Sequence, residues 1–175
     1  MEIKKLTIWD FDGTLVDTPL PEEGKKIYKE KTGKEWPHAG WWGQPLSLDM
    51  SVFDMPTVPS VIADYEKEKA KPDTMTVMLT GRMVKLGDLV RKILADKHLT
   101  FDEYHFNRGG STDTAKIKTM EDILRRVNTI KEISIYDDRS EHIDIFKKWC
   151  ENQVETGRLQ SFKIFHVING IPTLV

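Results

Sequence analysis

Two aspartates that follow a hydrophobic segment are the first residues whose types and spacing suggest chemistry. The stretch from Leu6 to Thr18 reads LTIWDFDGTLVDT, so that the apolar run stops at Asp10 and a second acid follows at Asp12. Alternate residues of a strand point to the same side, and the two acids can therefore face one site. Crowded carboxylates repel each other unless a cation or a proton offsets their charge, and Mg²⁺, which takes oxygen ligands, is the simplest such cation. Gly13 allows a sharp turn whose amides can face an anion.

Two later apolar segments also end in polar residues. These are Thr80, Gly81 and Arg82 after residues 74–79, and Asp137 and Asp138 after residues 132–136. A hydroxyl beside the first turn of a helix is suited to anions, so Thr80 either binds an anion or merely caps the helix that follows. Arg82 can reach the same anion or pair with a neighbouring acid. The two adjacent aspartates either join Asp10 at a metal or form a solvated turn.

Strands and helices alternate along the chain. The apolar patterns predict strands at about residues 3–9, 74–79, 101–106, 132–136 and 162–168, and helices at about residues 22–31, 59–71, 82–97, 115–127 and 140–155. This alternation is typical of a three-layer α/β/α sandwich with a mainly parallel, Rossmann-like sheet of five strands. Ligands of such sheets bind beyond the carboxyl ends of the strands, where these acids and Thr80 are expected to meet.

Residues 18–72 are predicted to form a helix-loop-helix insert rather than a separate cap. The loop in this insert is rich in Pro, Gly and Trp and has no sustained periodicity, so we expect an ordered loop that serves at most as a small lid. Trp36, Trp41 and Trp42 lie in it. They either stack on a base of a substrate or pack the loop onto the core, and packing is expected for at least one of them.

The whole-chain numbers are those of one globular domain over residues 1–175. The chain is 39% hydrophobic and carries a net charge of −2, which argues against a protein that coats nucleic acid by bulk charge but leaves a local basic patch open. The single cysteine, Cys150, excludes an internal disulfide. The first residues lack the apolar core of a signal peptide, and no stretch is long enough to span a membrane. We therefore expect a soluble, cytoplasmic protein with no obligate protein partner.

The segment DFDGTLVD resembles the first motif, DxDGT, of the haloacid dehalogenase (HAD) superfamily. Leu79-Thr80-Gly81-Arg82 resembles its second motif, and Asp137-Asp138 its fourth in the DD form. The DDR-x-x-H sequence that ends at His142, together with the GWWGQP tract at residues 40–45, is similar to the HAD domains of Swiss Army Knife RNA-repair proteins. The DDR sequence also resembles the phosphatase half of polynucleotide kinase-phosphatases. All four motifs occur in the superfamily's order, and the resemblance extends to about residue 168.

This resemblance implies roles for individual residues. Asp10 would be the nucleophile and Asp12 the general acid and base. Mg²⁺ would be held by Asp10, the backbone carbonyl of Asp12 and Asp138, with Asp137 acting through water. The phosphoryl group would be bound by Thr80, Gly81, Arg82, Arg139 and the lysine of the third motif.

The lysine of the third motif has two candidates, Lys116 and Lys118. The family's arrangement of Thr, two residues, an apolar residue and Lys favours Lys118, which is therefore expected to be catalytic and to bind phosphate. His142 either helps to fix the acids near the metal or is an ordinary histidine at a helix start.

The function that the resemblance implies is hydrolysis of a phosphomonoester through an aspartyl-phosphate. An open site without a large cap suits a bulky substrate such as a terminal phosphate on DNA or RNA. A 5′-nucleotidase or a broad-specificity phosphatase for small molecules is the main alternative, because no basic stripe is evident. A phosphotransferase and a non-catalytic module that binds phosphorylated ends are further alternatives. The expected partner is thus a phosphorylated nucleic-acid end or a nucleotide.

Overall fold

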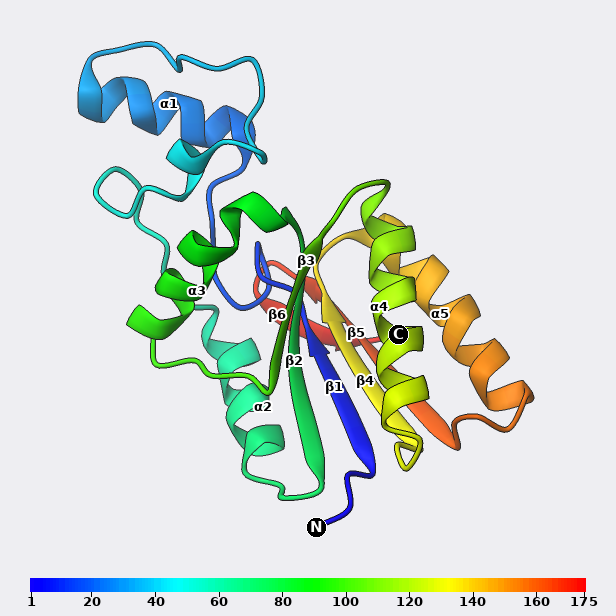
Figure 1. Cartoon of the computed structure of the whole chain (residues 1–175). Coiled ribbons are helices and arrows are strands. Elements are labelled where there is room, and N and C mark those ends of the chain that lie inside the picture. Colours follow the sequence, from blue (N-terminus) through cyan, green and yellow to red (C-terminus); the bar gives the residue numbers. More distant parts are fainter.

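The computed structural model describes all 175 residues, and its centre is a six-stranded sheet in the order β3-β2-β1-β4-β5-β6 (Figure 1). Five strands are parallel, namely β1 (Lys5–Trp9), β2 (Thr74–Met83), β3 (Glu103–Asn107), β4 (Glu132–Asp137) and β5 (Ser161–Ile168). The predicted α/β class with a mainly parallel sheet is confirmed. Strand β1 lies between β2 and β4, which brings the ends of three strands to one rim.

The prediction of five strands is wrong, because a sixth, β6 (Ile171–Leu174), pairs antiparallel with β5 at the edge of the sheet. Asn169 and Gly170 join the two strands, and both have positive φ angles, +49° and +77°. An Asn-Gly pair between short apolar runs is a strong hairpin signal, so the sequence did contain the information.

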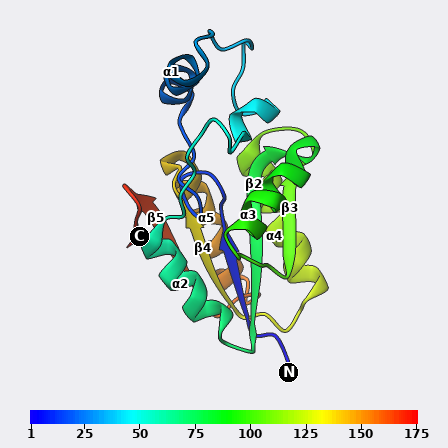
Figure 2. The same cartoon turned by 90° about the vertical axis from the view of Figure 1, so that its left-hand side faces the viewer.

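Helices cover both faces of the sheet. Helices α2 (Pro59–Lys69) and α3 (Gly87–Asp96) lie on one side, and α4 (Thr112–Arg126) and α5 (Ser140–Glu155) lie on the other (Figures 1 and 2). The alternation of side chains along β1 divides the core accordingly. Leu6 and Ile8 pack among residues of α4 and α5, whereas Trp9 packs with residues of α2 and α3.

The predicted insert at residues 18–72 has two parts with different positions. Helix α2 packs against the sheet, whereas α1 (Pro21–Thr32) and the loop that follows it project beyond the carboxyl ends of the strands (Figures 1 and 2). Trp41 is buried in this projecting part, where its ring lies against Gly24 and Phe53. A short 3-10 helix, η1 (Pro45–Leu48), follows.

Strand β2 is longer than the sequence predicts. It continues through Thr80 and Gly81 to Met83, which pairs with Asn107 of β3, and a 3-10 turn, η2 (Val84–Leu86), separates it from α3. The prediction of a helix that begins at Arg82 is therefore wrong, because pairing with β3 overrides the local helical pattern. None of the helices is both long and apolar enough to cross a membrane.

Candidate active site

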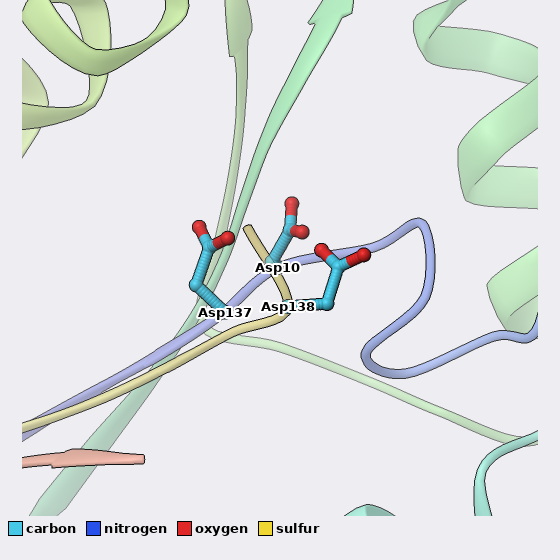
Figure 3. A group of neighbouring side chains, drawn as sticks. All are labelled: Asp10, Asp137 and Asp138. Carbon is cyan, nitrogen blue, oxygen red and sulfur yellow. The ribbon is translucent and has the colours of Figure 1, made fainter. Parts of the chain in front are cut away.

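Three carboxylates meet where β1 and β4 end. The parallel register pairs Trp9 with Tyr136, so the residues that follow, Asp10 just after β1 and Asp137 at the end of β4, lie side by side. One carboxylate oxygen of each of Asp10, Asp137 and Asp138 lies within 4.8 Å of the others. Figure 3 shows the three carboxylates pointing to the same side of the strand ends. Asp10 and Asp137 are almost completely buried, and Asp138 is half-buried.

Lys116, not Lys118, contacts these acids. Its Nζ donates to Asp10 Oδ1 at 3.0 Å and to Asp137 Oδ2 at 2.7 Å, and the side chain is buried. The expectation that Lys118 lies in the site is wrong, because this residue is exposed. Two residues correspond to about 200° around a helix, so the two lysines cannot face the same way.

The charges of this cluster perturb its pKa values. Burial raises the pKa of Asp10 well above the ordinary range; Lys116 opposes this rise, and the negative charges of Asp137 and Asp138 add to it. Burial, together with the charge of Asp137, also raises the pKa of Asp138 to about 6. At Asp137 burial is outweighed by Lys116 and His142, which hold its pKa far below the usual value. The single positive charge of Lys116 therefore does not offset the negative charges of all three carboxylates.

This donor set fits a hard divalent cation. Asp10 and Asp138 present carboxylate oxygens, the ligands that such a cation prefers, and burial raises the pKa of both even with Lys116 close by. Gly13 has a φ of +68°, and a Cβ at this position would overlap the Asp138 carboxylate. The turn after Asp12 therefore passes directly against the Asp138 carboxylate. Both oxygens of Asp137 accept hydrogen bonds from protein groups, Oδ2 from Lys116 Nζ and Oδ1 from the Arg139 amide.

Asp12 lies in different surroundings. The Arg82 guanidinium donates to both of its oxygens, from Nε to Oδ2 at 2.9 Å and from Nη2 to Oδ1 at 2.8 Å. The hydroxyl of Thr18 donates to Oδ1 at 2.7 Å. Of the two interpretations of Arg82 from the sequence, phosphate contact or an acid partner, the structure favours the acid partner.

Gly81 and Thr80, two of the predicted phosphate-binding residues on β2, differ in their access to the pocket. Gly81 lines the pocket, and Thr112 at the start of α4 packs so closely on it that a Cβ there would overlap the threonine. Thr80 is buried, and its Oγ1 accepts a hydrogen bond from the Arg82 amide at 3.1 Å. Since α3 begins only at Gly87, Thr80 does not cap that helix.

A pocket of about 350 Å³ opens above these groups. Its polar lining includes Asp10, Asp12, Arg82, Lys116, Asp138, Arg139 and His142, and its apolar lining is Leu20 and Trp42. Of the three tryptophans in the loop, only Trp42 lines this pocket, and 43% of it is exposed. Trp36 packs on Tyr28 and Trp41, so the packing role expected for at least one tryptophan is confirmed.

Arg139 and His142 lie where α5 begins. The Arg139 side chain pairs with Glu141, at 2.6 Å from Nη2 to Oε1, and half of its side chain remains exposed at the pocket. His142 is buried, with Nδ1 3.3 Å from Asp137 Oδ2. This contact favours the interpretation in which His142 helps to fix an acid of the cluster.

A comparison with protein-family models adds an independent finding. Residues 19–175 match HAD domain family 1 in Swiss Army Knife RNA repair proteins. The chain belongs to this HAD family. Membership indicates a hydrolase of the phosphatase type, in agreement with the four motifs that the sequence contains in order.

Individual relatives are also similar to this HAD domain. An uncharacterized protein of Saccharomyces cerevisiae is 33% identical over 170 residues, which cover 84% of this chain and 37% of the yeast protein. The chain thus spans about a third of the length of that curated relative. Two structures of the HAD domain of the effector protein Lem4 from Legionella pneumophila, one of them an inactive mutant, each align with a TM-score of 0.48 at 12% identity, covering 94% of this chain and 86% of that domain.

Proposed function

We propose that this HAD domain is a Mg²⁺-dependent phosphomonoester hydrolase that works through an aspartyl-phosphate on Asp10. One observation carries the proposal above all others. The Asp10 carboxylate lies at the wall of an open pocket, 3.0 Å from the Lys116 ammonium and next to two further acids. A nucleophile, a fixed cation and a set of metal ligands are thereby gathered at one point.

In the first transfer, a carboxylate oxygen of Asp10 attacks the phosphorus in line. The new bond between oxygen and phosphorus forms while the bond from phosphorus to the leaving oxygen breaks, and Asp12 gives that oxygen a proton. Lys116 offsets the negative charge that would otherwise keep an anionic nucleophile away from an anionic substrate. When bound by Asp10, Asp138 and the Asp12 carbonyl, Mg²⁺ supplies further positive charge at the phosphoryl oxygens.

In the second transfer, a water molecule attacks the phosphorus of the aspartyl-phosphate. Asp12, which has lost its proton in the first step, accepts one from this water. The bond between Asp10 and phosphorus breaks, inorganic phosphate leaves, and both aspartates return to their starting states. Asp137 and His142 hold Lys116 and the end of β4 in place throughout.

A terminal phosphate on a nucleic acid is the substrate class that the pocket favours. Trp42 and Leu20 form an apolar rim beside the carboxylates, and an exposed aromatic ring is a surface on which a base can stack. Arg139 adds an exposed guanidinium at the same opening. The projecting part of the insert lies beyond the carboxyl ends of the strands (Figure 2), and the insert contributes only Leu20 and Trp42 to the lining of this pocket.

A nucleotide or another small phosphomonoester is the second candidate. A pocket of about 350 Å³ is large enough for a small ligand, and the chain carries a net charge of −2. Neither feature favours a long polyanion. The competing substrates differ in what lies beyond the phosphate, so a matched panel separates them.

The experiment measures phosphate release with and without Mg²⁺ from an oligonucleotide with a 3′-phosphate, one with a 5′-phosphate, nucleoside monophosphates and an aryl phosphate. We expect release only with Mg²⁺ and a higher kcat/KM for an oligonucleotide end. Asp10→Asn is the matched control and should abolish release from every substrate while the fold remains intact. Equal rates for nucleotides and oligonucleotides would favour the second candidate, and activity in Asp10→Asn would refute the nucleophile assignment.

A phosphotransferase would be revealed in the same assay. An added alcohol acceptor would then become phosphorylated in place of water. A non-catalytic module would bind the phosphorylated oligonucleotides without turnover.

A further inference from the structure

Arg82 belongs to a strand, yet it joins two segments that lie outside the sheet. Only 3% of this residue is exposed. Its Nε and Nη2 hold both oxygens of Asp12, while its Nη1 donates to the Trp42 carbonyl at 2.8 Å and to the Ser47 hydroxyl at 2.7 Å. The guanidinium carbon also lies 4.9 Å from the centre of the Trp42 ring.

These contacts argue against Arg82 as a main ligand of the phosphoryl group. A guanidinium carries five N–H bonds, and four of them are already used within the protein. Lys116 and Arg139 line the same pocket, and the Arg139 side chain is half exposed. Phosphate binding is thus better served by other cations of the site.

The contacts also differ from those of a purely structural arginine in the same chain. Arg158 donates only to main-chain carbonyls, those of Leu124, Val127 and Ile130, and lies outside the pocket. The planar Arg82 guanidinium instead makes a bidentate contact with a carboxylate. Such a contact fixes both the position and the plane of the carboxylate. The carboxylate it fixes is the one to which the proposed mechanism assigns the proton transfers.

We propose that Arg82 is a positioning residue that aims the Asp12 carboxylate at the leaving oxygen, and that residues 42–47 hold Arg82 for this task. The inference rests on the proposed phosphatase function. The loop that carries the exposed Trp42 ring is then connected to the proton donor through one side chain. A leaving group that contacts the Trp42 ring would therefore contact the same loop that holds Arg82 and, through Arg82, orients Asp12.

Substrates with different leaving groups provide the test. A nitrophenolate departs readily without a proton, whereas an alkoxide does not, so only alkyl esters depend strongly on a well-placed acid. The ratio kcat/KM reports the steps up to the first phosphoryl transfer, and it therefore excludes the later attack of water. We would measure kcat/KM for p-nitrophenyl phosphate and for an alkyl phosphate, both with Mg²⁺.

For Arg82→Met we expect kcat/KM for the alkyl phosphate to fall by about 100-fold, the lower range for general acid catalysis, and for the aryl phosphate by less than about 10-fold. Arg82→Lys keeps the positive charge but cannot make the bidentate contact with the Asp12 carboxylate, so it should show the same selective loss. Arg91→Met is the matched control, because the Arg91 guanidinium stacks on Tyr104 and Phe106 and does not line the pocket. It should leave both values unchanged.

A double-variant comparison shows whether the effect passes through Asp12. In an Asp12→Asn background, Arg82→Met should lower kcat/KM no further, because the group that it positions is already gone. Equal losses for the two esters, or a full additional loss in that background, would overturn the inference and leave the phosphatase proposal standing.

Ser47→Ala provides a second, milder test of the same contacts if the arginine variants fail to fold. It removes one hydrogen bond to Arg82 and should shift the two esters in the same selective sense by about 5-fold, the effect of a single hydrogen bond. An unchanged ratio of the two esters in a folded Ser47→Ala protein would overturn the role of the loop. A wild-type protein that releases phosphate neither from these esters nor from a phosphorylated oligonucleotide would refute the proposed function, and this inference with it.

Discussion

The two aspartates of the DxD sequence are separated by one residue but are held by different parts of the molecule. Asp10 is fixed by Lys116 of α4 and stands beside the end of β4, so its surroundings belong to the sheet and the helices that cover it. Asp12 is fixed by Arg82, which in turn is fastened to the loop beyond the sheet. The position of the proposed nucleophile therefore depends on the scaffold, whereas that of the proposed acid and base depends on contacts with the insert.

This difference makes the two halves of the site separable by mutation. A change around Asp10 should affect every phosphomonoester equally, because all substrates need the nucleophile and its charge compensation. A change around Asp12 or in the loop should affect substrates according to what they carry beyond the phosphate.

Lys116→Met should have the largest effect among the substitutions around the two aspartates. We expect kcat to fall by about 1,000-fold for aryl and alkyl phosphates alike, since the charge that offsets Asp10 and the phosphoryl oxygens is lost. Lys118→Met is the matched control and should stay within about 2-fold of the wild type, because an exposed side chain away from the site contributes little. Steady-state kinetics on both esters checks this, and a larger effect at Lys118 would contradict the assignment.

Trp42→Ala should have a smaller and more selective effect. We expect kcat/KM for a phosphorylated oligonucleotide to fall by about 10-fold, the loss of one base stacked on an aromatic ring. For a small alkyl phosphate we expect a fall of at most about 5-fold, because the main-chain carbonyl of residue 42 still accepts from Arg82 when the ring is removed. Trp36→Phe is the control, since Trp36 packs within the loop and donates to the Gly40 carbonyl. A uniform loss across substrates would show that Trp42 serves only to hold the loop.

Magnesium should stabilise the protein in a pH-dependent way. Because the pKa of Asp138 is raised to about 6 in the folded protein, this carboxyl group binds more protons in the metal-free fold than in the unfolded chain between about pH 4 and pH 6. The stabilising contribution of the Asp138 carboxyl to the folded state is thus largest at low pH and is lost as the pH rises toward 6. Above that range Asp138 is ionised and has no ion-pair partner of its own, unlike Asp10 and Asp137, and a bound Mg²⁺ would provide one.

We therefore expect saturating Mg²⁺ to raise Tm by about 3 °C at about pH 7.5 and by much less at about pH 5. Asp138→Asn should remove most of this shift and, without metal, should melt higher than the wild type at the higher pH, because one buried charge is gone. Differential scanning calorimetry measures both effects. Equal shifts at the two pH values would contradict a metal site built on Asp138.

Much of the scaffold could be predicted because its signals are local. The apolar runs that end at Asp10 and before Asp137 mark strands, and their parallel pairing brings these acids together whatever the rest of the chain does. Helix α5 has the predicted bounds, Ser140–Glu155. Lys116 could also have been found, because it stands four residues before the buried Met120 and thus on the same helix face.

The contacts that could not be predicted are those between distant segments. Asp12 and Arg82 are 70 residues apart, and no periodicity relates them. Their pairing requires β2 to continue past Thr80, which depends on the pairing of Met83 with Asn107 rather than on local propensity. The position of Trp42 likewise follows from the way Trp41 packs against Gly24 and Phe53.

The most direct test of the central claim is to trap the phosphoryl group on Asp10. Asp12→Asn lacks the base that activates water, so the intermediate formed from an aryl phosphate and Mg²⁺ should accumulate. After an acid quench and proteolysis, mass spectrometry should find one phosphoryl group on the peptide that contains Asp10, and none in the double variant Asp10→Asn with Asp12→Asn. A phosphoryl group on another residue, or none at all while the wild type releases phosphate, would contradict the account.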